Sequence, residues 1–184
     1  MSSKLRNFIR LTAEDRDHSW TAAACKPFLE VASWGYGLGA KMLRTLHERG
    51  VLTRKRLPFP VISIGNLTWG GTGKTPFVEY LARRIIDRKS TPMILMRGYG
   101  QDEVAQMKRQ VPKAVLGIGV DRFAVAQKIA KQEPVNLALL DDGFQHWALE
   151  RDLEIVLVNA LNPFGNGKLI PRGILREPVH HLKK

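Results

Sequence analysis

The stretch that decides the fold is Gly65-Asn66-Leu67-Thr68-Trp69-Gly70-Gly71-Thr72-Gly73-Lys74-Thr75. It follows a short β-branched run at 61–64 and precedes an amphipathic run at 75–88, whose apolar side chains recur on one helical face. Glycines allow such a loop to curl so that backbone N–H groups converge on a polyphosphate at the helix N-terminus. A strand, a glycine-rich loop ending in Lys-Thr and a helix together predict a phosphate-binding loop.

Within this loop we expect the nucleotide to be bound by Gly70, Gly71, Thr72, Gly73, Lys74 and Thr75. Lys74 would reach the β- and γ-phosphates of ATP, and the Thr75 hydroxyl would hold Mg²⁺. Thr68 stands where the usual pattern has its first glycine. The alternative interpretation is a glycine-rich strand-to-helix turn that binds no ligand.

An acidic pair follows a second buried run. The apolar residues 137–140 lead into Asp141-Asp142-Gly143-Phe144-Gln145-His146. An acidic residue at the carboxyl end of a buried strand is the second Mg²⁺ ligand that P-loop enzymes require. Two adjacent carboxylates are costly unless a cation neutralises them, so we expect Asp141 and Asp142 to bind the metal. The alternative is a solvated turn, and His146 by itself would more often be structural.

The remaining pattern alternates strands with helices. Apolar runs at 93–96, 114–118, 137–140 and 155–158 predict strands, and 121–131 predicts a helix. Nearly continuous apolar strands separated by amphipathic helices favour a parallel sheet covered on both faces. We therefore expect an α/β, P-loop NTPase-like, doubly wound and mostly parallel sheet with an N-terminal amphipathic helix. The Asn-Lys-x-Asp motif of GTPases is absent from the sequence.

That amphipathic helix is predicted at 27–46. It presents Trp34 and Tyr36, residue types that favour membrane interfaces, and basic residues follow or overlap it: Lys41, Arg44, Arg49, Arg54, Lys55 and Arg56. An apolar face beside a basic cluster suits an interfacial anchor on anionic lipid. The alternative is a helix packed on the protein's own core. Residues 1–12 are basic and contain no acid, which fits an organellar presequence or a polar terminus equally.

Composition limits the classes of function. The 184 residues carry a net charge of +12, with the excess in residues 1–120, and this field attracts nucleic acid, anionic lipid or phosphorylated small molecules. The pI of about 10.2 is not accompanied by a basic face interleaved with aromatics or by a known module, so we expect no nucleic-acid partner. A single cysteine, Cys25, excludes an internal disulfide. No uninterrupted apolar stretch reaches the length of a transmembrane helix, so a membrane contact would be peripheral.

Several motifs in fixed order resemble those of the tetraacyldisaccharide 4'-kinases of lipid A synthesis. The resemblance runs from about residue 26 to the end and is carried by the 65–76 loop, Arg97-Gly98-Tyr99-Gly100, Asp102-Glu103, the 119–122 stretch, 141–146, Arg151-Asp152-Leu153-Glu154-Ile155-Val156, 164–173 and Leu175-Arg176-Glu177-Pro178. It implies a transferase that phosphorylates the 4'-hydroxyl of a lipid disaccharide 1-phosphate at a membrane surface, using ATP and Mg²⁺.

The resemblance also assigns residues. Lys74 and Thr75 correspond to the ATP and Mg²⁺ ligands, and Asp102 to the base that acts on the sugar hydroxyl. Asp141, Asp142 and His146 correspond to the metal and active-site group. Further active-site positions correspond to Arg97, Tyr99 and Glu177. Phosphoryl transfer chiefly needs positioned phosphates, a cation and a carboxylate able to accept the hydroxyl proton, which agrees with the reading from the residues.

We divide the sequence into an N-terminal segment, 1–56, with the membrane-interface helix and basic cluster, and a P-loop kinase lobe, 57–184. Gln101 replaces the glycine of the family's Gly-Asp-Glu motif. The resemblance implies a second lobe as well, and we expect this chain to correspond to the N-terminal lobe. The rival function is therefore a truncated nucleotide-binding module without catalysis, and we expect slow or no turnover by this chain alone. The expected location is a membrane surface: the inner face of a bacterial inner membrane, or a mitochondrion in a plant-type eukaryote.

Overall fold

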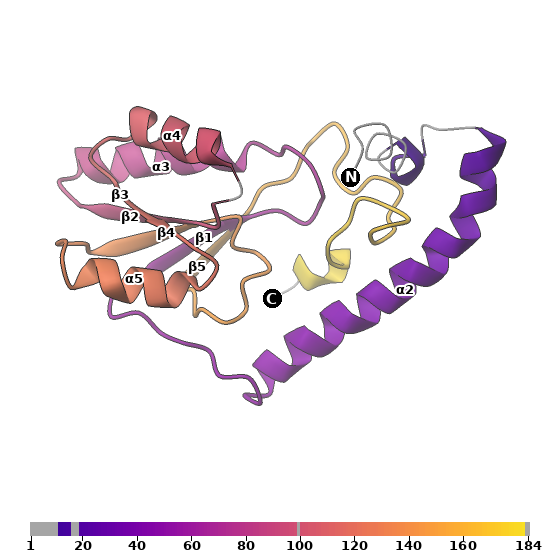
Figure 1. The fold of residues 1–184 in the computed structure, drawn as a ribbon, viewed down its shortest axis with the longest axis horizontal. Helices are drawn as coiled ribbons and strands as arrows, with labels where there is room; N and C mark the ends of the chain where they lie inside the picture. Colours follow the sequence, from indigo (N-terminus) through magenta and orange to yellow (C-terminus); the bar gives the residue numbers. More distant parts are fainter. Residues whose placement is uncertain (1–10, 16–18, 99, 183–184) are drawn as a thin grey trace. The chain divides into compact units, whose positions relative to one another are not determined.

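A computed structural model describes residues 11–15, 19–98 and 100–182 (Figure 1). The chain forms two compact units. The sheet unit comprises residues 50–66 and 73–157, and the terminal unit comprises residues 1–49, 67–72 and 158–184. The chain therefore passes through the terminal unit for six residues in the middle of the phosphate loop before it returns to the sheet unit at Gly73.

The sheet unit is built on five parallel strands, β1 (Val61–Gly65), β2 (Pro92–Met96), β3 (Val115–Ile118), β4 (Leu137–Asp141) and β5 (Leu153–Val156). Their order is β3-β2-β4-β1-β5. Val61 pairs with Ala138 and Ile64 with Asp141, so the carboxyl ends of β1 and β4 meet at one edge. This register places the start of the glycine loop beside the acidic pair.

Three helices cover the sheet. α3 (Lys74–Asp87) and α4 (Gln101–Gln110) lie over one face, and α5 (Arg122–Ala130) lies over the other (Figure 1). Buried side chains fill both interfaces: Val78, Ala82 and Met107 pack with Ile94 and Leu139 on the first face, and Ala126 packs with Met93, Leu95 and Leu140 on the second. The predicted doubly wound parallel sheet is confirmed.

Two elements differ from the sequence prediction. β5 lies two residues earlier than 155–158, because Ile62 of β1 pairs with Leu153. The helix α4 has no counterpart among the predicted elements, because its sequence is polar; among the side chains that the structure describes in this helix, Met107 is the fully buried one. The helix is indicated by its charges rather than by its apolar residues. Acidic residues occupy the first turn and basic residues the last, as the helix dipole favours.

The terminal unit contains the long helix α2 (Trp20–Glu48) and a short 3₁₀ helix, η1 (Val179–Leu182). α2 begins seven residues before the predicted start at 27, because the Ser19 hydroxyl accepts a hydrogen bond from the Ala22 N–H at 3.2 Å and caps the helix. Within the described part of the chain, no helix is both long and apolar enough to cross a membrane.

Candidate functional site

The glycine-rich loop joins β1 to α3, and two of its glycines have backbone conformations with positive φ. Gly70 has φ +126° and Gly73 has φ +79°, a region that residues with a Cβ rarely adopt. Gly73 caps α3 without any side-chain hydrogen bond, and space is open around a Cβ placed at Gly70, Gly71 or Gly73. A helix N-terminus without a side-chain cap favours an anion, because the helix dipole and the first N–H groups attract negative charge.

Lys74, the first residue of α3, is held by two groups in the sheet unit. Its Nζ donates a hydrogen bond to Oδ1 of Asn66 at 2.9 Å and lies 3.6 Å from Oδ1 of Asp142. Asn66 follows β1 directly and is fully buried. The ammonium is thereby fixed at the carboxyl edge of the sheet, where a β- or γ-phosphate would meet it.

Asp141 ends β4 and is buried beside α3. Its Oδ2 accepts a hydrogen bond from the Thr75 hydroxyl at 3.4 Å, while its buried Oδ1 has no hydrogen-bond partner among the described residues. Burial raises the pKa of this carboxyl and the neighbouring Asp142 raises it further, against the opposing effect of Lys74. Asp142 has φ +52°, an unusual backbone conformation for a residue with a side chain.

These oxygen donors fit Mg²⁺. Mg²⁺ in nucleotide sites is usually bound by one or two carboxylates together with phosphate oxygens and water, rather than by a cage of protein ligands. Thr75, Asp141 and Asp142 supply such a partial set, and the unpaired buried Oδ1 of Asp141 is a polar atom that a cation would satisfy. Consistently, no cluster of three or more His, Cys, Asp or Glu suited to a metal occurs among the described residues.

Two further groups line this edge of the sheet. Arg122, the first residue of α5, is buried and donates from Nη2 to the Asp141 carbonyl oxygen at 3.1 Å. Burial lowers the pKa of His146 to about 4, with smaller contributions from the positive charges of Arg122 and Arg151. His146 is therefore neutral near pH 7 and able to accept a hydrogen bond.

Sequence analysis did not assign roles in this site to Asn66 or Arg122. Both could have been found from position, because Asn66 directly follows the first strand and Arg122 opens a helix after the third. Of the predicted residues, the structure brings together Lys74, Thr75, Asp141 and Asp142.

The other predicted residues are less closely joined to this group. Arg97 is exposed after β2, close enough for its charge to lower the pKa of His146 slightly. Asp102 is exposed in the first turn of α4. Tyr99 lies outside the described residues. Glu177 belongs to the terminal unit, where it contacts Arg44 and His181.

Comparison with known proteins identifies the family. The model of the tetraacyldisaccharide-1-P 4'-kinase family matches residues 25–184. The chain belongs to this family. Tetraacyldisaccharide 4'-kinase of Geobacter sulfurreducens is 39% identical over 81% of this chain and 49% of its own length. A probable mitochondrial tetraacyldisaccharide 4'-kinase of Arabidopsis thaliana is 41% identical over 98% of this chain and 54% of its own length.

A solved structure of this kinase family supports the fold. The LpxK crystal structure from Aquifex aeolicus, an "apo" form in complex with ATP, matches with a TM-score of 0.77 and 32% identity over 88% of this chain and 56% of that one. The chain thus spans about half the length of the relatives it matches. The predicted family and the P-loop kinase fold are both confirmed.

Because the pKa of Asp141 is raised, we expect the stability of the fold to depend on the ionisation of this carboxyl. A carboxyl whose pKa is higher in the folded state than in the unfolded state destabilises the fold when ionised, and this cost disappears as the pH falls toward the unfolded value of 3.8. We expect Asp141→Asn to raise the melting temperature at pH 7 by about 2–4 °C, the effect of roughly 1 kcal/mol in a domain of this size.

The measurement is thermal unfolding of both proteins from pH 7 to pH 4, with and without Mg²⁺. The advantage of Asp141→Asn should shrink on acidification, and added Mg²⁺ should stabilise only the wild type. A difference in melting temperature between Asp141→Asn and the wild type that does not change with pH would show that burial does not disfavour the ionised form of Asp141.

Proposed function

We propose that this chain binds ATP and Mg²⁺ and provides the kinase lobe that phosphorylates the 4'-hydroxyl of a tetraacyldisaccharide 1-phosphate in lipid A biosynthesis. The observation that carries the proposal is the meeting of the loop lysine, Lys74, with the carboxylates of β4 at one edge of the sheet. Family membership supports the choice of acceptor.

The contacts of Lys74, Thr75, Asp141 and Asp142 support their roles, and the family resemblance supports the roles of Asp102, Arg97, Tyr99 and His146. Lys74 and the uncapped start of α3 would bind the β- and γ-phosphates, and Thr75, Asp141 and Asp142 would hold Mg²⁺. Mg²⁺ would offset the charge that develops on the phosphate oxygens. Asp102 would take the proton of the 4'-hydroxyl while the hydroxyl oxygen forms a bond to the γ-phosphorus. The bond between the γ-phosphorus and the bridging oxygen would break, and ADP would leave. Arg97, Tyr99 and neutral His146 would line the site.

Binding at a membrane surface would occur through α2. Apolar side chains recur along its length and remain exposed, among them Phe28 at 78% and Trp34 at 70%, together with Trp20, Val31, Leu38 and Met42. Of the predicted cations, Lys41 and Arg49 are exposed on or just after the helix. An apolar stripe with flanking cations is the pattern of a helix that lies in the headgroup region of anionic lipid.

Some cations of the predicted basic cluster form ion pairs within the protein, which leaves fewer of them for contact with lipid. Arg44 is buried, forming ion pairs with Glu48 and Glu177. In the sheet unit Lys55 pairs with Asp121, and Arg56 pairs with Glu150 and Asp152. These three cations are partly or wholly neutralised within the protein. The exposed apolar stripe and the remaining cations support a peripheral location, and the bacterial and mitochondrial relatives support the inner face of a bacterial inner membrane or a mitochondrion.

Nucleotide binding is tested by Lys74→Ala. A hydrogen bond to a charged group contributes about 1.5–3 kcal/mol, so the variant should bind ATP-Mg²⁺ roughly ten- to a hundredfold more weakly in calorimetric titration. Lys128→Ala, which removes an exposed cation from the outer face of α5, serves as the matched control. Equal affinity of all three proteins would contradict the assignment of the loop.

Membrane binding is tested by flotation with vesicles that contain anionic lipid. Burying a large apolar side chain contributes about 1.5–3 kcal/mol, so Phe28→Ser with Trp34→Ser should abolish most binding, and the wild type should release with rising salt. Leu161→Ser, at a residue that is 96% exposed elsewhere in the terminal unit, should bind normally. Wild-type binding that does not change with lipid charge or salt would contradict a role of the flanking cations, and a wild type that does not bind the vesicles would contradict a membrane role of α2.

Catalysis is tested by Asp102→Asn. An amide keeps the size of the side chain but cannot accept the proton, and general-base catalysis contributes typically 100- to 10,000-fold. Transfer of the γ-phosphoryl group to the lipid disaccharide should fall by that factor while ATP affinity stays unchanged. Glu103→Gln, in the same turn of α4, is the control.

Two results would redirect the proposal. Unchanged transfer by Asp102→Asn would move the base elsewhere, with Asp142 as the next candidate. Tight ATP binding by the wild type without any transfer would favour the rival function, a nucleotide-binding module without catalysis.

A further inference from the structure

The first half of the phosphate loop is held by a short backbone ladder inside the terminal unit. The Trp69 N–H donates to the Ile174 carbonyl at 2.6 Å, and the Arg176 N–H donates to the Leu67 carbonyl at 2.7 Å. Between them Thr68 forms an antiparallel bridge with Leu175. Because Leu67, Thr68 and Leu175 are all buried, these bonds fix the backbone of residues 67–69 within the terminal unit.

The residue after this ladder is a buried carboxylate. Glu177 is 2% exposed and lies 3.7 Å from Nη1 of Arg44 and 2.9 Å from Nδ1 of His181. Arg44 belongs to the last turns of α2 and is itself buried. A buried charge of this kind is tolerated only with its partner, and removing either member is strongly destabilising to the local arrangement. The ion pair therefore fixes residues 174–177 against α2.

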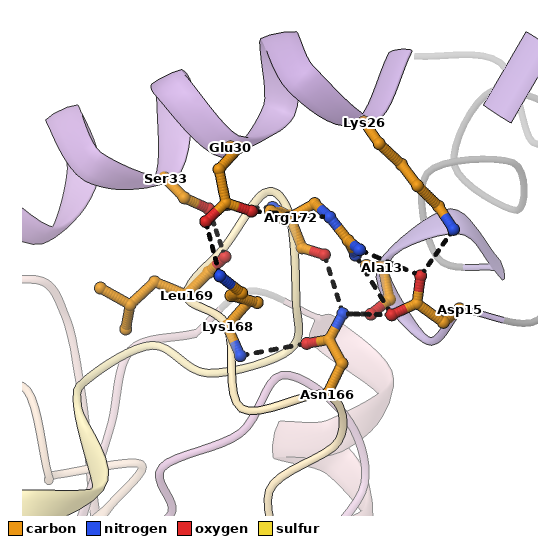
Figure 2. Close-up of polar contacts among 9 residues, drawn as sticks. All are labelled: Ala13, Asp15, Lys26, Glu30, Ser33, Asn166, Lys168, Leu169 and Arg172. Carbon is orange, nitrogen blue, oxygen red and sulfur yellow. Dashed lines mark hydrogen bonds and ion pairs between the residues drawn. The ribbon is translucent and has the colours of Figure 1, made fainter. Parts of the chain in front are cut away.

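A second set of contacts holds the preceding residues to the same helix (Figure 2). The Ser33 hydroxyl donates to the Leu169 carbonyl at 2.5 Å and accepts from the Arg172 N–H at 3.1 Å. Glu30 pairs with Lys168 at 2.7 Å, and Lys26 pairs with Asp15. Ion pairs with Lys26 and Arg172 and a hydrogen bond from Asn166 lower the pKa of Asp15 well below its usual range despite burial, so it stays charged.

We propose that Arg44 and Glu177 are positioning residues of the nucleotide site, which they serve by fixing the backbone of residues 174–176 and, through it, Leu67 to Trp69 of the phosphate loop. The proposal rests on the proposed ATP binding. It changes the role of Glu177 from an active-site group, as the family resemblance suggested, to a group that acts through the loop. A loop held in its binding conformation loses less entropy when phosphate binds, so affinity depends on this ion pair.

The test compares Glu177→Gln with the wild type in two measurements. Calorimetric titration with ATP-Mg²⁺ should show about tenfold weaker binding, the cost of ordering a few loop residues. Hydrogen exchange should be faster at the amides of residues 67–75 and unchanged in the strands of the sheet unit. Glu150→Gln, which removes a carboxylate from the exposed Arg56–Glu150 pair, is the matched control and should alter neither measurement.

A double-mutant cycle shows whether Arg44 and Glu177 act on ATP binding as one pair or independently of each other. Arg44→Gln should weaken ATP binding as much as Glu177→Gln, and the double variant should be no weaker than the worse single variant. If Glu177→Gln does not fold, Arg44→Lys keeps the charge with a shorter reach and should show the same two changes at smaller size.

Three results would overturn the proposal. The first is unchanged ATP affinity and unchanged exchange of residues 67–75 in the variants. The second is weaker ATP binding with unchanged loop exchange, which would mean that Glu177 meets the nucleotide itself. The third is faster exchange throughout both units, which would make the ion pair a general stabiliser. A wild type that binds no ATP would refute the proposed function instead, and the exchange comparison would still decide whether the pair positions the loop.

Discussion

The charge balance at the carboxyl edge of the sheet is the constraint on which the site depends. Asp141 and Asp142 are adjacent in sequence, and Asp141 is buried at the end of β4, so their repulsion must be offset. Lys74 offsets part of it, and Asn66 holds the lysine without adding another negative charge. The cost of the two adjacent carboxylates that Lys74 does not offset is the reason why we propose that this edge binds a divalent cation together with a polyphosphate.

The topology explains why these groups meet. β1 and β4 are sequence-distant but lie side by side in the order β3-β2-β4-β1-β5, so the residues that follow them share one edge. The parallel direction of every strand pair means that the chain must cross over between strands, and each crossover returns the chain to the same end. Arg122, at the start of α5, and Asp102, near the start of α4, therefore begin their helices at the carboxyl side of the sheet.

The terminal unit uses polar contacts where the sheet unit uses apolar packing. Ser33, Arg44 and Glu30 of α2 bind the residues near the C-terminus through hydrogen bonds and ion pairs. Those contacts use the polar side chains of α2 and leave Trp20, Phe28 and Trp34 exposed, while Tyr36 is partly buried. One helix can thus be held firmly within the unit and still present an apolar stripe to a lipid surface.

The sequence by itself determined the sheet, the phosphate loop and the acidic pair, because each is a local pattern: continuous apolar strands, glycines before Lys-Thr, and carboxylates after a strand. It did not reveal α4, whose polar sequence lacks a buried stripe, nor the role of Asn66, whose contact with Lys74 requires the loop to close. Only the tertiary structure decided that Arg44, which looked like a lipid-binding cation, is buried against Glu177. A pattern of charges along one helix cannot show which of them meets a partner more than a hundred residues away, because that depends on how the chain folds back.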